Sequence, residues 1–231
     1  MQKKTLCYLR PSTKEQFAYF VKCIDPSQTI VHCSEHSSVD QTNLPYLYYS
    51  FLKKKKLSLK KTTLSKLEAD DMIARCRLLR VITKKEALNH LIAMYLAINE
   101  VLNFEKPNFA IMQTVDSYVT DLIRFVCLKK KIKFIGIVST GFNNCFRVTS
   151  RGEMTKNSKL DKNLTKLLLP KYIKESYTPD FITSSLNNPK KKIFIRWLKN
   201  FIGFFYFFIK RYLSGDRYNY HYWHQQIMCK Q

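Results

Sequence analysis

Glycine is scarce in this sequence, with 5 in 231 residues. A dinucleotide-binding fingerprint needs closely spaced glycines in the turn between a strand and the helix that follows it. The turn after the first predicted strand contains Arg10, Pro11 and Ser12, and none of these is a glycine. We therefore exclude a dinucleotide fingerprint at this turn.

Paired cysteines and long apolar runs are also missing. The 7 cysteines are scattered along the chain, and no two of them form a CxxC pair. Most lie within apolar runs, which favours small buried side chains in a reducing cytoplasm over a disulfide framework. The first residues lack the apolar stretch of a signal peptide, and the sequence has no run of about 18 apolar residues. We expect a cytoplasmic protein without a spanning helix.

Acidic residues are few. The sequence has 17 of them against 40 basic residues, which gives a net charge of +23. Ten of the basic residues are arginines and the other 30 are lysines. Lysine is a strongly hydrated point charge, so the excess favours an anionic surface or a solubilising coat over a site that reads base edges. A non-enzymatic nucleic-acid-binding protein is the alternative function that charge alone favours, and its binding would weaken steeply with salt.

No metal site or cofactor is expected. His32 and His36 bracket Glu35, but a strand runs into a loop there, so the four-residue spacing does not place both rings on one helix face. His221 and His224 lie in an aromatic tail and are interpreted in the same way.

Four short apolar runs predict an α/β domain. They occupy residues 5–9, 29–33, 109–114 and 134–138, and helical patterns separate them. Strand, helix, strand repeats of this length suit right-handed parallel crossovers. We predict a Rossmann-like, mainly parallel sheet flanked by helices over residues 1–153. Residues 154–189 are expected to form a linker with short helices, and residues 190–231 a basic amphipathic aromatic helix and a tail.

Capping patterns mark three helix starts. A serine or threonine stands three residues before a glutamate at Ser12, Ser65 and Thr83. The third pattern begins a long helix that is apolar over most of its girth, so we expect this helix to pack on the sheet. Arg75, Arg77 and Arg80 are predicted to share one helix, with Arg77 and Arg80 on the same side and Arg75 pointing elsewhere. They are expected to form either a solvated basic face or part of a site.

Ligands of parallel sheets bind beyond the carboxyl ends of the strands. Two stretches are predicted to lie there, residues 114–117 and 139–153. Asp116 is expected either to cap the following helix or to contact a ligand. Residues 146–153 are either a short edge strand or an anion and sugar site. In the second case arginines would bind phosphate, and hydroxyls with Glu153 would bind sugar hydroxyls.

Several of these stretches together resemble a known family. Arg75-x-Arg77-Leu78-Leu79-Arg80, Lys106-Pro107, Val115-Asp116-Ser117-Tyr118-x-x-Asp121 and Phe146-Arg147-x-Thr149-x-Arg151-Gly152-Glu153 are similar to segments of bacterial capsule and surface-polysaccharide biosynthesis proteins, which are similar to GT-B type glycosyltransferases. The resemblance covers about residues 64–153 and extends weakly to residues 216–222. Cys76 departs from the pattern, because an acidic residue is expected between the arginines.

The resemblance implies a glycosyltransferase-like protein, or the acceptor-side N-terminal half of one. The nucleotide-sugar usually binds mainly to the C-terminal half, which is expected to be missing or supplied by a partner chain. The implied ligand is a nucleotide-sugar or a lipid-linked glycan acceptor. Asp116 and Glu153 are the expected catalytic residues, and Ser117, Arg147, Thr149 and Arg151 are expected to bind substrate.

The segment 190–213 is predicted to form a basic amphipathic helix. Lys192, Arg196, Lys199 and Lys210 align with Gly203 and Tyr206 in one stripe, and apolar side chains cover the remaining surface. The helix is expected either to lie on the inner face of an anionic membrane or to pack in a core, its own or that of a missing domain. The residues expected to make this contact are Lys192, Arg196, Trp197, Lys199, Phe204, Phe205, Phe208 and Lys210.

Overall fold

The computed structural model describes residues 3–9, 13–35, 39–54, 57–113, 117–139, 146–149 and 189–213. The chain divides into two compact units. The first holds a sheet with its helices, which we term the α/β unit, and the second holds a single described helix. Residues 154–188 of the predicted linker and the tail after residue 213 lie outside the described residues, and Pro189, the last residue of the predicted linker, begins the helix of the second unit.

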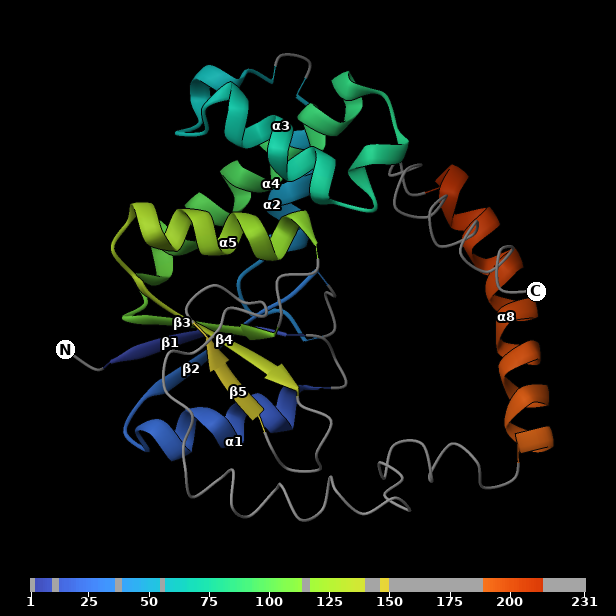
Figure 1. Cartoon of the computed structure of the whole chain (residues 1–231), viewed down its shortest axis with the longest axis horizontal. Helices are drawn as coiled ribbons and strands as arrows, with labels where there is room; N and C mark the ends of the chain where they lie inside the picture. The colour runs from blue at the N-terminus through green and yellow to red at the C-terminus, as the bar shows by residue number, and fades with distance from the viewer. Residues whose placement is uncertain are drawn as a thin grey trace, which may run out of the picture. The chain divides into compact units, whose positions relative to one another are not determined.

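Five strands form one sheet in the order β2-β1-β3-β4-β5 (Figure 1). Their bounds are β1 (Lys4–Tyr8), β2 (Thr29–Cys33), β3 (Phe109–Gln113), β4 (Lys133–Ser139) and β5 (Phe146–Thr149). The first four strands pair in parallel, and β5 pairs with β4 in the antiparallel direction. The predicted α/β class and mainly parallel sheet are thus confirmed, with each predicted strand placed to within one residue. The arrangement is consistent with a Rossmann-like fold.

Helices cover both faces of the sheet. Helix α1 (Lys14–Ile24) lies on one side, and α4 (Lys84–Glu105) and α5 (Tyr118–Lys129) lie on the other (Figure 1). Helix α2 (Leu44–Leu52) and helix α3 (Lys66–Arg75) pack against α4, as does α5. Because α4 has neighbours on several sides, its buried residues extend around most of its girth.

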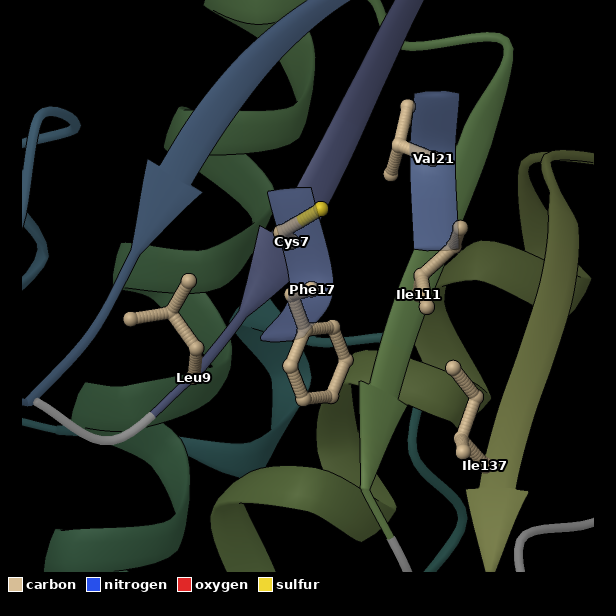
Figure 2. Packing of buried hydrophobic residues seen from close by; sticks show 6 residues of the cluster. All are labelled: Cys7, Leu9, Phe17, Val21, Ile111 and Ile137. Carbon is tan, nitrogen blue, oxygen red and sulfur yellow. The ribbon is translucent and has the colours of Figure 1, made fainter. Parts of the chain in front are cut away.

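The apolar core between α1 and the sheet explains why α1 lies there. Phe17 and Val21 of α1 meet Cys7, Ile111 and Ile137 of the strands and Leu9, which follows β1 (Figure 2). Side chains alternate between the two faces of a strand, so Leu6 and Tyr8, also buried, point to the opposite face. Strands buried on both faces read as continuous apolar runs, which is the pattern that the sequence shows at residues 5–9.

Two of the three predicted capping boxes are confirmed. In α3, Glu68 N donates to Ser65 Oγ at 3.1 Å and Ser65 N donates to Glu68 Oε2 at 2.8 Å. Thr83 and Glu86 make the same reciprocal bonds at the start of α4. The predicted start of α1 is wrong by one residue, since the N-cap is Thr13 and not Ser12. Two hydroxyl residues adjoin there, and the three-residue spacing to Glu15 favoured Ser12, although the helix begins after Thr13.

The prediction that three arginines share one helix is wrong. Helix α3 ends at Arg75, and Cys76 is its C-cap with extended backbone angles. Arg77 follows in a turn, and Arg80 lies in the short 3-10 helix Leu79–Val81. Cys76 and Leu79 are both buried. Burying these two side chains turns the chain inward, which ends the helix before the second arginine.

The second unit contains helix α8 (Pro189–Leu213). Most of its described large apolar side chains are exposed. Within the described residues, none of the helices combines the length and apolar character that crossing a bilayer requires.

Replacing Phe17 by alanine should test the packing of α1 on the sheet. The Phe17 side chain is 1% exposed, so its removal should lower the free energy of unfolding by about 3–5 kcal/mol. Tyr19 on the same helix is 67% exposed, and Tyr19→Ala should cost less than about 1 kcal/mol. Urea denaturation followed by circular dichroism measures both. Equal losses for the two variants would contradict the packing described here.

Candidate functional site at the carboxyl edge of the sheet

The strand order reverses between β1 and β3, which pair with each other at the centre of the sheet. The chain leaves β1 towards α1 on one face, and it leaves β3 towards α5 on the opposite face (Figure 1). The two connections therefore diverge at the carboxyl ends of neighbouring parallel strands. In open parallel sheets this reversal of strand order is where ligands bind. The amino ends of α1 and α5 both begin at this edge, and helix amino ends carry partial positive charge.

Ser117 is the N-cap of α5. Thr120 N donates to Ser117 Oγ at 3.4 Å, and Ser117 N donates to Thr120 Oγ1 at 3.2 Å. The prediction that Asp116 caps this helix is therefore wrong. Asp116 itself lies outside the described residues. Ser117 follows β3 closely, so the predicted position of this residue at the carboxyl edge is confirmed, and its hydroxyl oxygen stabilises the first turn of α5.

The segment 146–149 forms a short edge strand, which is one of the two alternatives that the sequence analysis gave for residues 146–153. Arg147 pairs with Val138 through the backbone near the carboxyl end of β4. Thr149 pairs with Gly136, farther from that end, and is 4% exposed. A side chain this buried is closed to a ligand that binds at the edge. Arg151 and Glu153 lie outside the described residues.

An ion-pair cluster fixes α5 to α3. Arg75 Nη2 lies 2.7 Å from Asp121 Oδ2 and 2.9 Å from Asp71 Oδ2, and Arg124 Nη2 lies 3.4 Å from Asp121 Oδ1. The Asp121 side chain is 5% exposed, whereas that of Asp71 is 59% exposed. The structure thus joins Arg75 and Asp121, two residues of the resemblance pattern, and the pair requires nothing from Cys76. Since Asp121 lies in the first turn of α5, the cluster holds the helix whose amino end reaches the edge.

The loop after β2 is organised by a carboxylate that sequence reasoning did not single out. Asp40 accepts hydrogen bonds from Ser34 N at 2.9 Å, from Thr42 Oγ1 at 2.8 Å and from Leu44 N at 3.0 Å. Close by in the sequence, Glu35 accepts one from Tyr8 Oη at 2.6 Å. The sequence signal that could have identified Asp40 is its position a few residues before a helix, where aspartate side chains often accept backbone hydrogen bonds. These bonds order the carboxyl edge beside β1.

His32 is a buried histidine on β2. Among the described residues its Nδ1 atom has no hydrogen-bond partner. Burial, together with the nearby charge of Lys14, lowers the pKa of His32 below its ordinary value of 6.5. The ring is therefore neutral at pH 7. His36 lies outside the described residues, within which no three histidine, cysteine or acidic side chains gather closely enough to hold a metal ion.

The buried thiols are poor nucleophiles. Burial raises the pKa of both Cys7 and Cys127 to about 12, and it also raises the pKa of Cys33. The thiolate is the reactive form of cysteine, so these three side chains are inert at neutral pH. They act as small core residues, as their positions in apolar runs indicate.

Comparisons with known proteins were negative: no protein-family model matches the sequence, and neither curated proteins nor solved structures gave a match.

Replacing Asp121 should show that its ion pairs stabilise the α/β unit. Asp121→Asn removes the charge that two arginines contact in a buried position, so we expect a loss of about 1–3 kcal/mol in the free energy of unfolding. Asp71→Asn removes an exposed partner of the same Arg75 and should cost less than about 0.5 kcal/mol. Thermal or urea denaturation measures the difference. Similar losses in the two variants would mean that burial adds nothing to the Asp121 pair.

The lowered pKa of His32 predicts a pH dependence of stability. Its folded-state pKa lies below the unfolded value, so the unfolded chain binds a proton first as the pH falls below about 6.5. Wild-type stability should therefore fall relative to that of His32→Leu as the pH falls from 7 through the folded-state pKa, and the difference should be constant above pH 7. Urea denaturation at several pH values measures it. Parallel curves for the two proteins would show that His32 does not titrate differently on folding.

Proposed function

We propose that this protein takes part in making a bacterial surface polysaccharide, as a glycosyltransferase-like protein or as its acceptor-side half. The ligand is a phosphate-bearing sugar, either a nucleotide-sugar or a lipid-linked glycan. It binds at the carboxyl edge of the sheet, where the chain leaves β1 and β3 towards helices on opposite faces. In this proposal the protein acts in the cytoplasm, where nucleotide-sugars are present.

The observation that carries the proposal is the reversal of strand order between β1 and β3. It supports a ligand site because the connections to α1 and α5 leave in opposite directions and the amino ends of both helices begin at the same edge. Partial positive charge at helix amino ends suits a phosphate group. The Arg75–Asp121 pair supports the same site indirectly, because it fixes the orientation of α5.

The proposed ligand contacts follow from chemistry. Arg147 and Arg151 bind the phosphate, since guanidinium groups match its geometry with paired hydrogen bonds. Ser117 lies at the amino end of α5, where it borders the bound phosphate. Asp116 and Glu153 orient sugar hydroxyls, and one of them serves as the general base for the attacking hydroxyl. Thr149 has no part in the proposed site, because its side chain is buried.

The proposal has two cases, which differ in the ligand that this chain binds. If the chain is the acceptor-side half, it binds the lipid-linked glycan by itself. Transfer then requires a second domain or partner chain that binds the nucleotide-sugar. If the chain binds the nucleotide-sugar directly, it carries the donor site as well. The two cases differ in which phosphate-bearing ligand binds to the isolated chain.

Calorimetric titration should separate these cases. The whole chain is titrated with nucleotide-sugars and, in detergent, with polyprenyl diphosphate-linked sugars. We expect saturable binding of at least one class. The double variant Arg147→Gln, Arg151→Gln should weaken it at least tenfold, because a hydrogen bond to a charged group contributes about 1.5–3 kcal/mol. Arg77→Gln is the matched control, since Arg77 is an exposed arginine in the turn after α3 and should leave affinity unchanged.

Two outcomes would contradict the proposal. One is the absence of binding by either ligand class while circular dichroism shows a folded chain. The other is tight binding of RNA or DNA that weakens steeply with salt, without affinity for the sugars, which would favour the nucleic-acid alternative.

A further inference from the structure

Helix α8 combines dense positive charge with a complete lack of acidic residues. Its 25 residues include Lys190, Lys191, Lys192, Arg196, Lys199, Lys210 and Arg211, and no aspartate or glutamate. Any surface that this helix contacts must therefore accept positive charge without help from acidic groups within the helix.

A line of aromatic rings runs along one side of α8. Phe194, Trp197, Phe201 and Phe205 follow each other at intervals of three or four residues, which places them on one face. Successive ring centroids lie 6.2, 5.5 and 5.2 Å apart. All four side chains are exposed, and Phe208 continues the line. Exposed apolar surface that is this continuous marks a binding face.

Four of the basic positions lie on the opposite side of the helix axis. Lys192, Arg196, Lys199 and Lys210 recur at spacings that keep them in one stripe, away from the aromatic line. Helices with an apolar aromatic face and a lysine-rich polar face lie in the plane of a lipid interface. Their aromatic rings enter the boundary between headgroups and acyl chains, and their lysines reach back to anionic headgroups.

The α/β unit has no exposed apolar stripe of comparable length among its described residues. Its exposed large hydrophobic side chains come one from each of six elements: Tyr19, Tyr46, Leu67, Phe104, Leu128 and Val148. Single exposed apolar residues of this kind are normal on protein surfaces. None of these elements offers an exposed apolar surface as long as α8, which is about 38 Å long.

The charge distribution favours a position on the surface of a bilayer over one across it. The uncharged stretch 200–209 spans about 15 Å as a helix, half of the roughly 30 Å hydrocarbon core. Lys199 precedes this stretch and Lys210 follows it. A helix that lies flat exposes both lysines to the headgroups and buries the aromatic line.

We propose that α8 is a lipid-binding helix that lies flat on an anionic membrane surface, with its aromatic line in the headgroup boundary. The partner is the lipid surface itself, recognised by its negative charge and its apolar interior. This inference does not depend on the proposed function, because it rests on α8 alone. It would also bring the chain to the surface where a lipid-linked substrate resides.

Vesicle flotation of the whole chain tests the proposal. The vesicles are either pure phosphatidylcholine or equal parts of phosphatidylcholine and phosphatidylglycerol. The chain should float with the anionic vesicles, stay behind with the neutral ones and be released by high salt. In a Trp223→Phe variant, Trp197 is the remaining tryptophan. Its emission should shift to shorter wavelength on binding, and brominated lipids should quench it.

Two sets of variants assign the binding to α8. Replacing Lys192, Lys199 and Lys210 by glutamine should weaken binding to anionic vesicles about a hundredfold. Replacing Phe201 and Phe205 by serine should weaken it to a similar degree, because each buried ring contributes strongly to insertion. The matched controls are a glutamine triple at the exposed Lys22, Lys66 and Lys85, and Phe104→Ser at a side chain that is 83% exposed. Both controls should bind as the wild type does.

Several results would overturn the proposal. A chain that stays behind when the anionic vesicles float would contradict it, as would a Trp197 whose emission is not quenched when the chain binds. Equal losses in the charge control would place the contact on the α/β unit. If the Phe201 and Phe205 variant unfolds the α/β unit, as seen in its circular dichroism melting curve, α8 belongs to a core. If sedimentation shows that the rings hold two copies together in the absence of lipid, the aromatic line is a dimer interface.

Discussion

The pairing of β1 with both β2 and β3 is the constraint on which the α/β unit depends. Thr5 of β1 pairs with Ile30 on one side and with Phe109 on the other, although Phe109 lies far along the chain. Leu6 and Cys7 are buried, so the backbone of β1 has no access to water and needs both partner strands for its hydrogen bonds. Once β1 is central, the helices that follow β1 and β3 cover opposite faces, and the carboxyl edge between them is the candidate site.

The parts of the fold that could be predicted are those governed by local chemistry. Short apolar runs gave the four parallel strands, and the boxes at Ser65 and Thr83 marked their helices because a cap involves residues only three apart. The parts that could not be predicted depend on distant contacts. Helix α3 ends early because Cys76 turns into the core, and Arg75 meets Asp121 from another helix. No local pattern encodes either event.

The candidate site also has one part that the sequence could predict and another that it could not. The rule that ligands bind beyond parallel strands placed Ser117 correctly at the carboxyl edge, because it follows from strand direction alone. The identity of the helix cap was missed, since the choice between Asp116 and Ser117 depends on backbone angles at a single residue. The burial of Thr149 could not be predicted from the sequence either, because it results from the pairing of β5 with β4, in which Thr149 lies opposite Gly136. The two units thus present different surfaces: a carboxyl edge at which we propose that a phosphate-bearing ligand binds, and an aromatic helix with a lysine stripe.

The most direct test of the ligand site is a map of backbone amide shifts during titration with nucleotide-sugars or lipid-linked sugars. Parallel strands give this experiment an internal control, because the amino ends of β1 and β3 lie at the far edge of the same sheet. The account predicts that the largest shifts occur at residues 9–13 and 113–120, with little change near Lys4 and Asn108. Largest shifts at the amino edge, or a saturated complex that leaves both predicted segments unchanged, would contradict it.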